Sequence, residues 1–155
     1  MSEKKTVNYF DENGNPHTQN DDDTRLISEL SDKDRETVFT IISLLFEKTE
    51  RPEYRGAHWA KHLFQSSVLL GVDIYMTMNM FVDAMKKSGF ECVPDGKEWR
   101  FNVRETCIKS LNGAKNRPLS EVLARSYPFQ SEKRWCRKHA AEITWIRKEL
   151  GDQNG

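Results

Sequence analysis

Two histidines in the run His58-Trp59-Ala60-Lys61-His62 could bind a metal ion. Residues four apart lie on one face of a helix, and two histidines so placed can bind zinc. A zinc protease with this histidine spacing needs glutamate directly after the first histidine, but Trp59 occupies that position. Lys61 favours a solvated or phosphate-facing surface, and we predict no metal site here.

Three cysteines, Cys92, Cys107 and Cys136, could also carry chemistry, and Cys136 has Cys-x-x-His spacing with His139. Zinc ribbons and fingers draw their ligands from close pairs, which Cys92 and Cys107 do not form. We expect buried free thiols, although a Cys–His nucleophilic pair stays open because such partners meet only in the fold. An odd number of cysteines behind a polar start, without a secretory signal, favours a reducing cytoplasm.

A glycine-rich phosphate loop is absent from the sequence. Gly89 and Gly96 are instead predicted to lie at the boundary and in the turn of a hairpin. We therefore predict a protein that is not an enzyme and that holds no cofactor and no metal.

Basic and aromatic residues are interleaved in the C-terminal third of the chain. Such a combination can hold phosphates and stack on bases. The residues are Lys115, Arg117, Arg125, Lys133, Arg134, Arg137 and Lys138, among Tyr127, Phe129 and Trp135. Trp135 is better explained as a core residue. For Lys133, Arg134, Arg137 and Lys138, phosphate binding and simple solvation of a helix face both stay open.

The net charge of zero conceals an uneven distribution. Residues 1–53 contain seven basic and thirteen acidic residues, whereas residues 54–155 contain seventeen basic and eleven acidic residues. Within the second region, segment 97–138 contains eleven basic and four acidic residues. This asymmetry is typical of a nucleic-acid surface or of a basic body with an acidic arm, but solvated helix faces can also differ in charge. The 155-residue chain is 37% hydrophobic and 31% charged, and no run of eighteen apolar residues predicts a membrane span.

The chain divides into a flexible, acidic N-terminal arm at residues 1–24 and one helical domain at residues 25–150. Asn13-Gly14 predicts a tight turn, and Val7 to Phe10 could form a short strand before it. The charged run Asp21-Asp22-Asp23 offers no second strand, so we expect the arm to be mostly disordered.

Three helices are predicted in the first half of the domain. One starts at the cap Ser31 and buries Val38, Ile41, Ile42 and Leu45 at helical spacing. A second runs from about Gly56 to Ser66, with Trp59, Ala60, Leu63 and Phe64 on its inner side. A third runs from the cap Asp73 to Ser88, with a buried stripe of Ile74, Met78, Phe81 and Met85.

A β-hairpin and further helices complete the prediction. Phe90 to Val93 and Lys97 to Val103 alternate around the turn Pro94-Asp95-Gly96. Helices are expected from Arg104 to Asn112, stopped by Gly113, and again after Pro118. The last helix runs from the cap Ser131 to about Leu150, with Trp135, His139, Ile143, Ile146 and Leu150 in its stripe.

The order helix, helix, connection, helix, hairpin, helix over residues 31–112 resembles a winged-helix domain, with a C-terminal helical extension at 113–150. The resemblance implies a mainly α fold and a DNA-binding, helix-turn-helix type of protein. It also implies that helix 73–88 enters the major groove and that the hairpin is a wing near phosphates. The implied nucleic-acid contacts are Tyr75, Thr77, Asn79, Lys86, Lys97 and Arg100, to which the C-terminal cations Arg117, Lys133, Arg134, Arg137 and Lys138 add phosphate contacts.

Helix 73–88 has a second interpretation as a core helix. No Lys or Arg occupies its first three turns, and Met76, Met78, Met80 and Met85 make a second apolar face. That face could pack on the C-terminal helices or on a second copy in a homodimer. The expected function is DNA binding in transcription regulation or as a replication accessory. The alternative is a protein-binding inhibitor or adaptor without catalytic activity, whose acidic arm mimics phosphate charge or folds back on the basic body.

Overall fold

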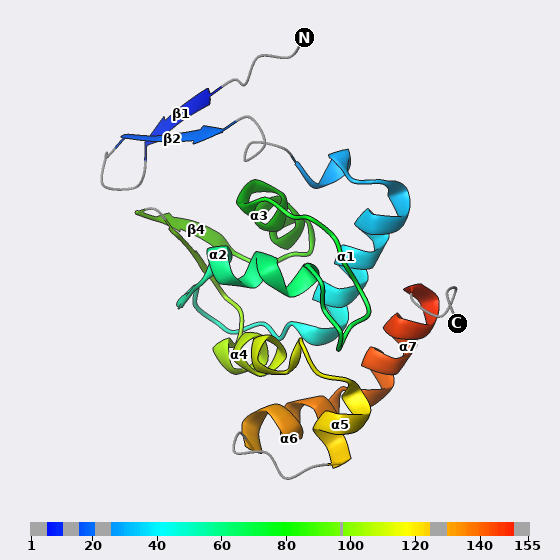
Figure 1. Cartoon of the computed structure of the whole chain (residues 1–155). Coiled ribbons are helices and arrows are strands. Elements are labelled where there is room, and N and C mark those ends of the chain that lie inside the picture. Colours follow the sequence, from blue (N-terminus) through cyan, green and yellow to red (C-terminus); the bar gives the residue numbers. More distant parts are fainter. Residues whose placement is uncertain (1–5, 11–15, 21–25, 97, 125–129, 151–155) are drawn as a thin grey trace.

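The computed structural model describes residues 6–10, 16–20, 26–96, 98–124 and 130–150 (Figure 1). These residues form a mainly helical fold with a small antiparallel sheet, which confirms the predicted fold class. None of the described helices is long and apolar enough to cross a membrane. The helices are α1 (Asp32–Leu45), α2 (Ala57–Ala60), α3 (Met78–Lys87), α4 (Glu105–Ala114), α5 (Leu119–Ala124), α6 (Gln130–Lys138) and α7 (Ala140–Leu150), with short 3-10 helices η2 (Ile27–Glu29) and η3 (Lys61–Phe64).

The predicted hairpin is present, with a third strand beside it. Strands β4 (Cys92–Asp95) and β5 (Glu98–Phe101) pair antiparallel, and β3 (Tyr54–Arg55) pairs with the other edge of β5. The turn lies later than predicted, because Asp95 pairs with Glu98 and only two residues connect them. Pro94 belongs to β4, opposite Trp99, and Gly96 supplies the positive φ of +66° that begins the connection.

The N-terminal segment contains more regular structure than its composition predicts. Strand β1 (Thr6–Phe10) pairs antiparallel with β2 (Pro16–Asn20), in the register Thr6 to Asn20. Backbone groups alone make such a ladder, so the polar residues 16–20 can pair without an apolar face. The predicted Asn13-Gly14 turn and the Asp21–Asp23 run lie outside the described residues.

Helix α1 follows its sequence pattern closely. The Ser31 hydroxyl accepts a hydrogen bond from the Asp34 backbone N–H at 3.1 Å, which caps the helix. Its predicted inner stripe, from Val38 to Leu45, is fully buried. The helix ends at Leu45, where Phe46 takes an extended conformation and continues the core.

The second helix is shorter than predicted. Helix α2 ends at Ala60 and passes into η3, which makes tighter turns of three residues. Leu63 and Phe64 are buried as expected, but the Trp59 side chain is 65% exposed. The change of helix type removes the four-residue spacing that placed Trp59 above Leu63, so the prediction that Trp59 faces inward is wrong.

Helix α3 begins four residues later than predicted, at Met78. Thr77 is its N-cap, and the Thr77 hydroxyl accepts a hydrogen bond from the Met80 N–H at 3.1 Å. Asp73 caps no helix, because its carboxylate accepts from the Ser66 N–H at 3.0 Å and holds the preceding loop. Residues 73–77 therefore form an irregular lead into α3 rather than its first turn.

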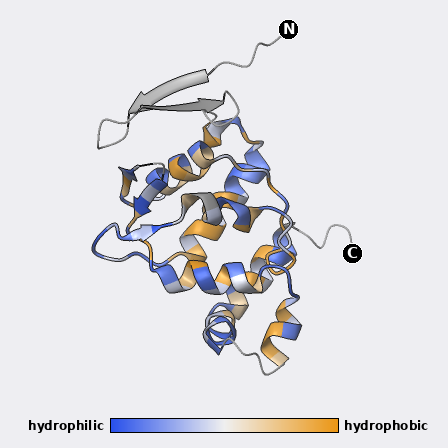
Figure 2. Cartoon of the chain, turned by 60° about the vertical axis from the view of Figure 1, so that its left-hand side comes forward, coloured by the Kyte–Doolittle hydropathy of each residue, from blue (hydrophilic) through white to orange (hydrophobic). Residues whose placement is uncertain are grey.

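The methionines and phenylalanines around α3 form one core. Met76, Met80 and Met85 are almost fully buried and Met78 is partly buried against the core, so most of the predicted second apolar face is covered within this chain. Phe81 lies at the centre, with ring centroids 5.4 Å from Phe101 and 6.3 Å from Phe64. Figure 2 shows hydrophobic and hydrophilic residues alternating along the helices that surround this core.

The C-terminal helices differ from prediction at two places. Gly113 lies inside α4, which continues to Ala114, and the Glu132 carboxylate occupies the space that a side chain at Gly113 would fill. The predicted helix 131–150 is two helices, α6 and α7, joined at His139. Trp135, Ile143 and Ile146 are buried as expected, whereas the side chain of Leu150 lies outside the described residues. Helix α6 packs on α4, and α7 lies beside α1 (Figure 1).

Candidate nucleic-acid interface

Helix α6 separates basic and buried residues onto different faces. At 100° per residue, Lys133, Arg134, Arg137 and Lys138 fall within one half of the helix circumference. Trp135 and the following Cys136 fall on the other side and are buried. Arg134, Arg137 and Lys138 are exposed and Lys133 is partly exposed, so this side of α6 is a basic face.

A groove between α4 and α6 adjoins this basic face, and we call it the α4–α6 groove. Its cations are Arg104 at the N-cap of α4, together with Arg134 and Lys138 of α6. Hydroxyl groups come from Thr106, Ser110 and Ser131, and the remaining lining residues are Glu47 and Trp135. The groove therefore combines positive charge with neutral hydrogen-bond donors in one concave surface.

Glu47 holds two of the three cations in place. Its carboxylate lies 3.2 Å from Arg104 Nε and 3.3 Å from Lys138 Nζ. Burial opposes ionisation of Glu47, but the hydrogen bond from Lys138 and the nearby positive charges outweigh it, so the pKa of Glu47 lies below its ordinary value. At neutral pH Glu47 is thus an anion that orients Arg104 and Lys138 along the groove.

Two donors of the groove have no acceptor among the described residues. Arg134 is exposed, and its guanidinium makes no ion pair within the described part of the chain. The Trp135 side chain is 7% exposed, and its indole nitrogen is shielded from solvent without a hydrogen-bond partner. The exposed guanidinium of Arg134 is therefore available to an acceptor that enters the groove, whereas the shielded indole nitrogen of Trp135 is not.

His139, at the junction of α6 and α7, is a buried polar residue that lies next to Trp135 and Glu47 of the groove. Its ring lies against Trp135, with centroids 4.5 Å apart, and its Nε2 is 3.7 Å from a Glu47 carboxylate oxygen. Burial lowers the pKa of His139 despite the opposing carboxylates of Glu142 and Glu47, and Lys138 lowers it further. His139 is therefore neutral at pH 7.

The predicted contacts of the third helix do not form one outward surface. Tyr75 is exposed but precedes α3, and Thr77 is buried with its hydroxyl capping the helix. Asn79 is partly buried in the first turn of α3. Lys86 is exposed near the helix end, with its ammonium 5.0 Å from the centre of the Trp99 ring. The prediction that Thr77 faces outward is wrong.

Arg100, the predicted wing cation that the structure describes, is engaged within the sheet. Arg100 of β5 and Arg55 of β3 both approach Asp95, at 3.6 Å and 2.6 Å between the nearest atoms. Arg100 is only partly exposed. Lys97, the other predicted wing contact, lies outside the described residues.

The remaining predicted cation, Arg117, follows α4 and is exposed. It lies close enough to Glu132 to favour ionisation of that carboxyl group, although burial dominates and raises the pKa of Glu132. Arg117 does not line the α4–α6 groove. Of the predicted site residues that the structure describes, only Arg134 and Lys138 line the groove, with Lys133 and Arg137 on the same helix face.

Sequence reasoning missed Arg104 and Glu47. Arg104 appeared there only as the start of a helix, and Glu47 stands 91 residues before Lys138. No spacing rule connects such distant positions, because their meeting depends on how α4 and α6 pack beside the end of α1. The excess of basic residues in segment 97–138 was the one sequence signal that included Arg104.

The sulfur and histidine groups form no cluster for chemistry in the part of the chain that the structure describes. Cys92, Cys107 and Cys136 are free, and burial raises their thiol pKa values to about 11, 11 and 12. Thiols with such values are poor nucleophiles at neutral pH. No group of three or more His, Cys, Asp or Glu residues that could hold a metal ion occurs among the described residues.

Comparison with known proteins places the chain in no family. No protein-family model, no curated protein and no solved structure matches it. Its function must be inferred from its own residues.

Proposed function

We propose that this chain binds nucleic acid through phosphate contacts from the α4–α6 groove and the basic face of α6. The observation that carries the proposal is the convergence of Arg104, Arg134 and Lys138 on one groove. Phosphate oxygens accept hydrogen bonds from arginine, lysine and hydroxyl groups, and all three kinds of donor line the groove.

The arrangement of charges favours a polyanion over a single small anion. Arg137 and Lys133 lie on the same side of α6 as the groove cations, but they do not line the groove. A nucleic-acid backbone carries regularly spaced phosphates and can contact the groove and the helix face together. Affinity would come from neutralised phosphates, so we expect it to depend strongly on salt.

The winged-helix interpretation stays part of this proposal in a modified form. The order α1, α2, α3, hairpin, α4 agrees with the predicted order of elements. However, half of the ten residues of α3 are buried, and its Asp83 pairs with Lys87 at 3.2 Å. We therefore assign phosphate binding to α4 and α6. We no longer assign the reading of DNA bases to α3.

Fluorescence anisotropy with a labelled DNA duplex, at several salt concentrations, tests the proposal. The double variant Arg134→Ala/Arg137→Ala is expected to weaken binding and to reduce the salt slope by about 1.8, because each lost phosphate contact changes it by about 0.9. The matched control is Arg51→Ala/Lys148→Ala, which removes two exposed cations outside the groove. Its effect should be much smaller.

Two results would contradict the proposal. One is the absence of duplex and single-strand binding by the parent protein at low salt. The other is equal weakening by Arg134→Ala/Arg137→Ala and by the control variant, which would indicate attraction to net charge without a defined surface.

A further inference from the structure

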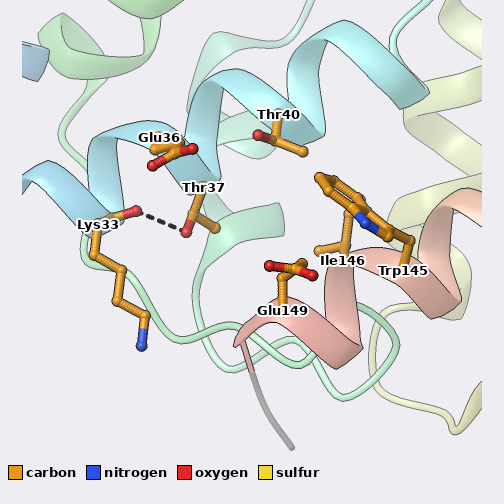
Figure 3. A pocket seen from close by; sticks show the side chains of 7 residues that line it. All are labelled: Lys33, Glu36, Thr37, Thr40, Trp145, Ile146 and Glu149. Carbon is orange, nitrogen blue, oxygen red and sulfur yellow. Dashed lines mark hydrogen bonds between the residues drawn. The ribbon is translucent and has the colours of Figure 1, made fainter.

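A second concave surface is lined by residues of α1 and α7, and we call it the α1–α7 groove. Thr40 and Trp145 line both of its adjoining hollows, and Leu44 and Ala141 extend it toward the start of α7. Figure 3 shows the Trp145 indole reaching from α7 toward Thr40 of α1. Ile146 closes the floor and is buried.

Large apolar side chains are exposed in this groove. Trp145 is 47% exposed and Leu44 is 37% exposed, although both lie in a hollow where a partner could cover them. Isolated apolar residues on a surface need no explanation, but a tryptophan and a leucine lining one hollow give an anchoring site. Tryptophan is among the residues that contribute most to protein interfaces.

The charge of the groove limits what can bind there. Its carboxylates are Glu36 of α1 and Glu142 and Glu149 of α7, against the single cation Lys33. Glu36 and Glu142 make no ion pair with any other described residue. A second copy docked through the same face would bring like charges together across a two-fold axis, which disfavours a symmetric dimer.

We propose that the α1–α7 groove binds an amphipathic helix of a partner protein. The apolar face of that helix covers Trp145 and Leu44, and its lysine or arginine residues meet Glu36 and Glu142. A groove between two helices accepts a third helix through apolar anchors at helical spacing. This proposal does not depend on nucleic-acid binding, because it uses residues that the α4–α6 groove lacks.

Two model peptides test the charge and the position of the site. One is a fluorescent amphipathic helix of leucine and lysine, and the other has glutamate in place of each lysine. The lysine peptide should bind and the glutamate peptide should not. Trp145→Ala should weaken binding about tenfold or more, whereas Trp59→Ala, which removes another exposed tryptophan, should not.

A charge reversal keeps the test decisive if Trp145→Ala fails to fold. Glu36→Lys/Glu142→Lys should abolish binding of the lysine peptide, while Glu50→Lys/Glu53→Lys makes the same charge change at exposed positions outside the groove. Equal binding of both peptides, or equal effects of the two double variants, would overturn the proposal. Self-association of the parent protein that Trp145→Ala abolishes would also overturn it, because the occupant would then be a second copy.

Discussion

Lys138 of α6 and Glu47, which follows α1, form an ion pair of 3.3 Å across 91 residues of sequence. The same carboxylate lies 3.2 Å from Arg104, so Glu47 links the end of α1 to both walls of the α4–α6 groove. One acidic residue thus positions two cations of the proposed nucleic-acid surface, and it also competes with phosphate for them.

Glu47→Gln should therefore act in opposite directions on stability and on binding. Loss of two partly exposed ion pairs is expected to lower the free energy of unfolding by about 1 kcal/mol. Release of Arg104 and Lys138 should raise the affinity for duplex DNA, by up to about tenfold at low salt. Urea unfolding and anisotropy measure the two effects. Weaker DNA binding by a folded Glu47→Gln variant would show that the orientation of the cations matters more than their release.

Substitutions of Thr77 distinguish its structural role as the cap of α3 from the DNA contact that the sequence predicted for it. Because its buried hydroxyl caps α3, Thr77→Ala should cost about 1 kcal/mol of stability, while Thr77→Ser should cost much less. Neither substitution should change the DNA affinity of the folded protein. Thermal unfolding and anisotropy provide the measurements. If Thr77→Ala preserved stability but weakened DNA binding, the base-reading prediction for this position would regain support.

The buried His139 predicts a dependence of stability on pH. Its pKa is lower in the folded protein than its ordinary value of 6.5, so the unfolded chain binds more protons below that pH. The free energy of unfolding should accordingly fall as the pH drops below about 6.5, until the folded pKa is passed. Denaturant unfolding between pH 7.5 and 5.5 measures this slope. His139→Phe, which keeps a ring against Trp135, should flatten it, and an unchanged slope would contradict this account.

Gly56 precedes α2 where the chain leaves no room for a side chain. A Cβ at this position would overlap the hydroxyl and ring of the buried Tyr54. Gly56→Ala should therefore lower the free energy of unfolding by about 1–3 kcal/mol. In Tyr54→Phe/Gly56→Ala the missing hydroxyl relieves part of the overlap, so the penalty should be smaller than in the single variant. Equal penalties in both backgrounds would show that Tyr54 does not set the limit.

Local sequence patterns predicted the elements whose signals lie within one turn or one alternation. Ser31 caps α1, the stripe from Val38 to Leu45 is buried, and strands β4 and β5 pair as a hairpin. The basic face of α6 also follows from spacing alone, because four cations fall on one half of a helix. These features depend on residues that are close in the chain, so their physics is visible in the sequence.

Competing local signals were resolved only in the folded structure. Asp73 and Thr77 are both good caps, and Thr77 caps α3 while the Asp73 carboxylate is engaged by Ser66. Trp59 was predicted to face inward, and it is exposed because α2 changes into a 3-10 helix after one turn. Neither outcome follows from the cap and spacing rules, because the Ser66 contact of Asp73 spans seven residues and helical periodicity does not mark where an α-helix passes into a 3-10 helix.

For the two candidate binding surfaces too, the sequence predicted part of the residues and the tertiary structure decided the rest. Composition alone indicated a basic C-terminal third, but the joining of Arg104, Lys138 and Glu47 into one groove needed α1, α4 and α6 to pack together. Trp145 gave no sequence signal, because its exposure depends on how α7 lies against α1. Periodicity and caps determine which helices form, whereas burial and ion pairing between distant residues decide which of their faces remain available for partners.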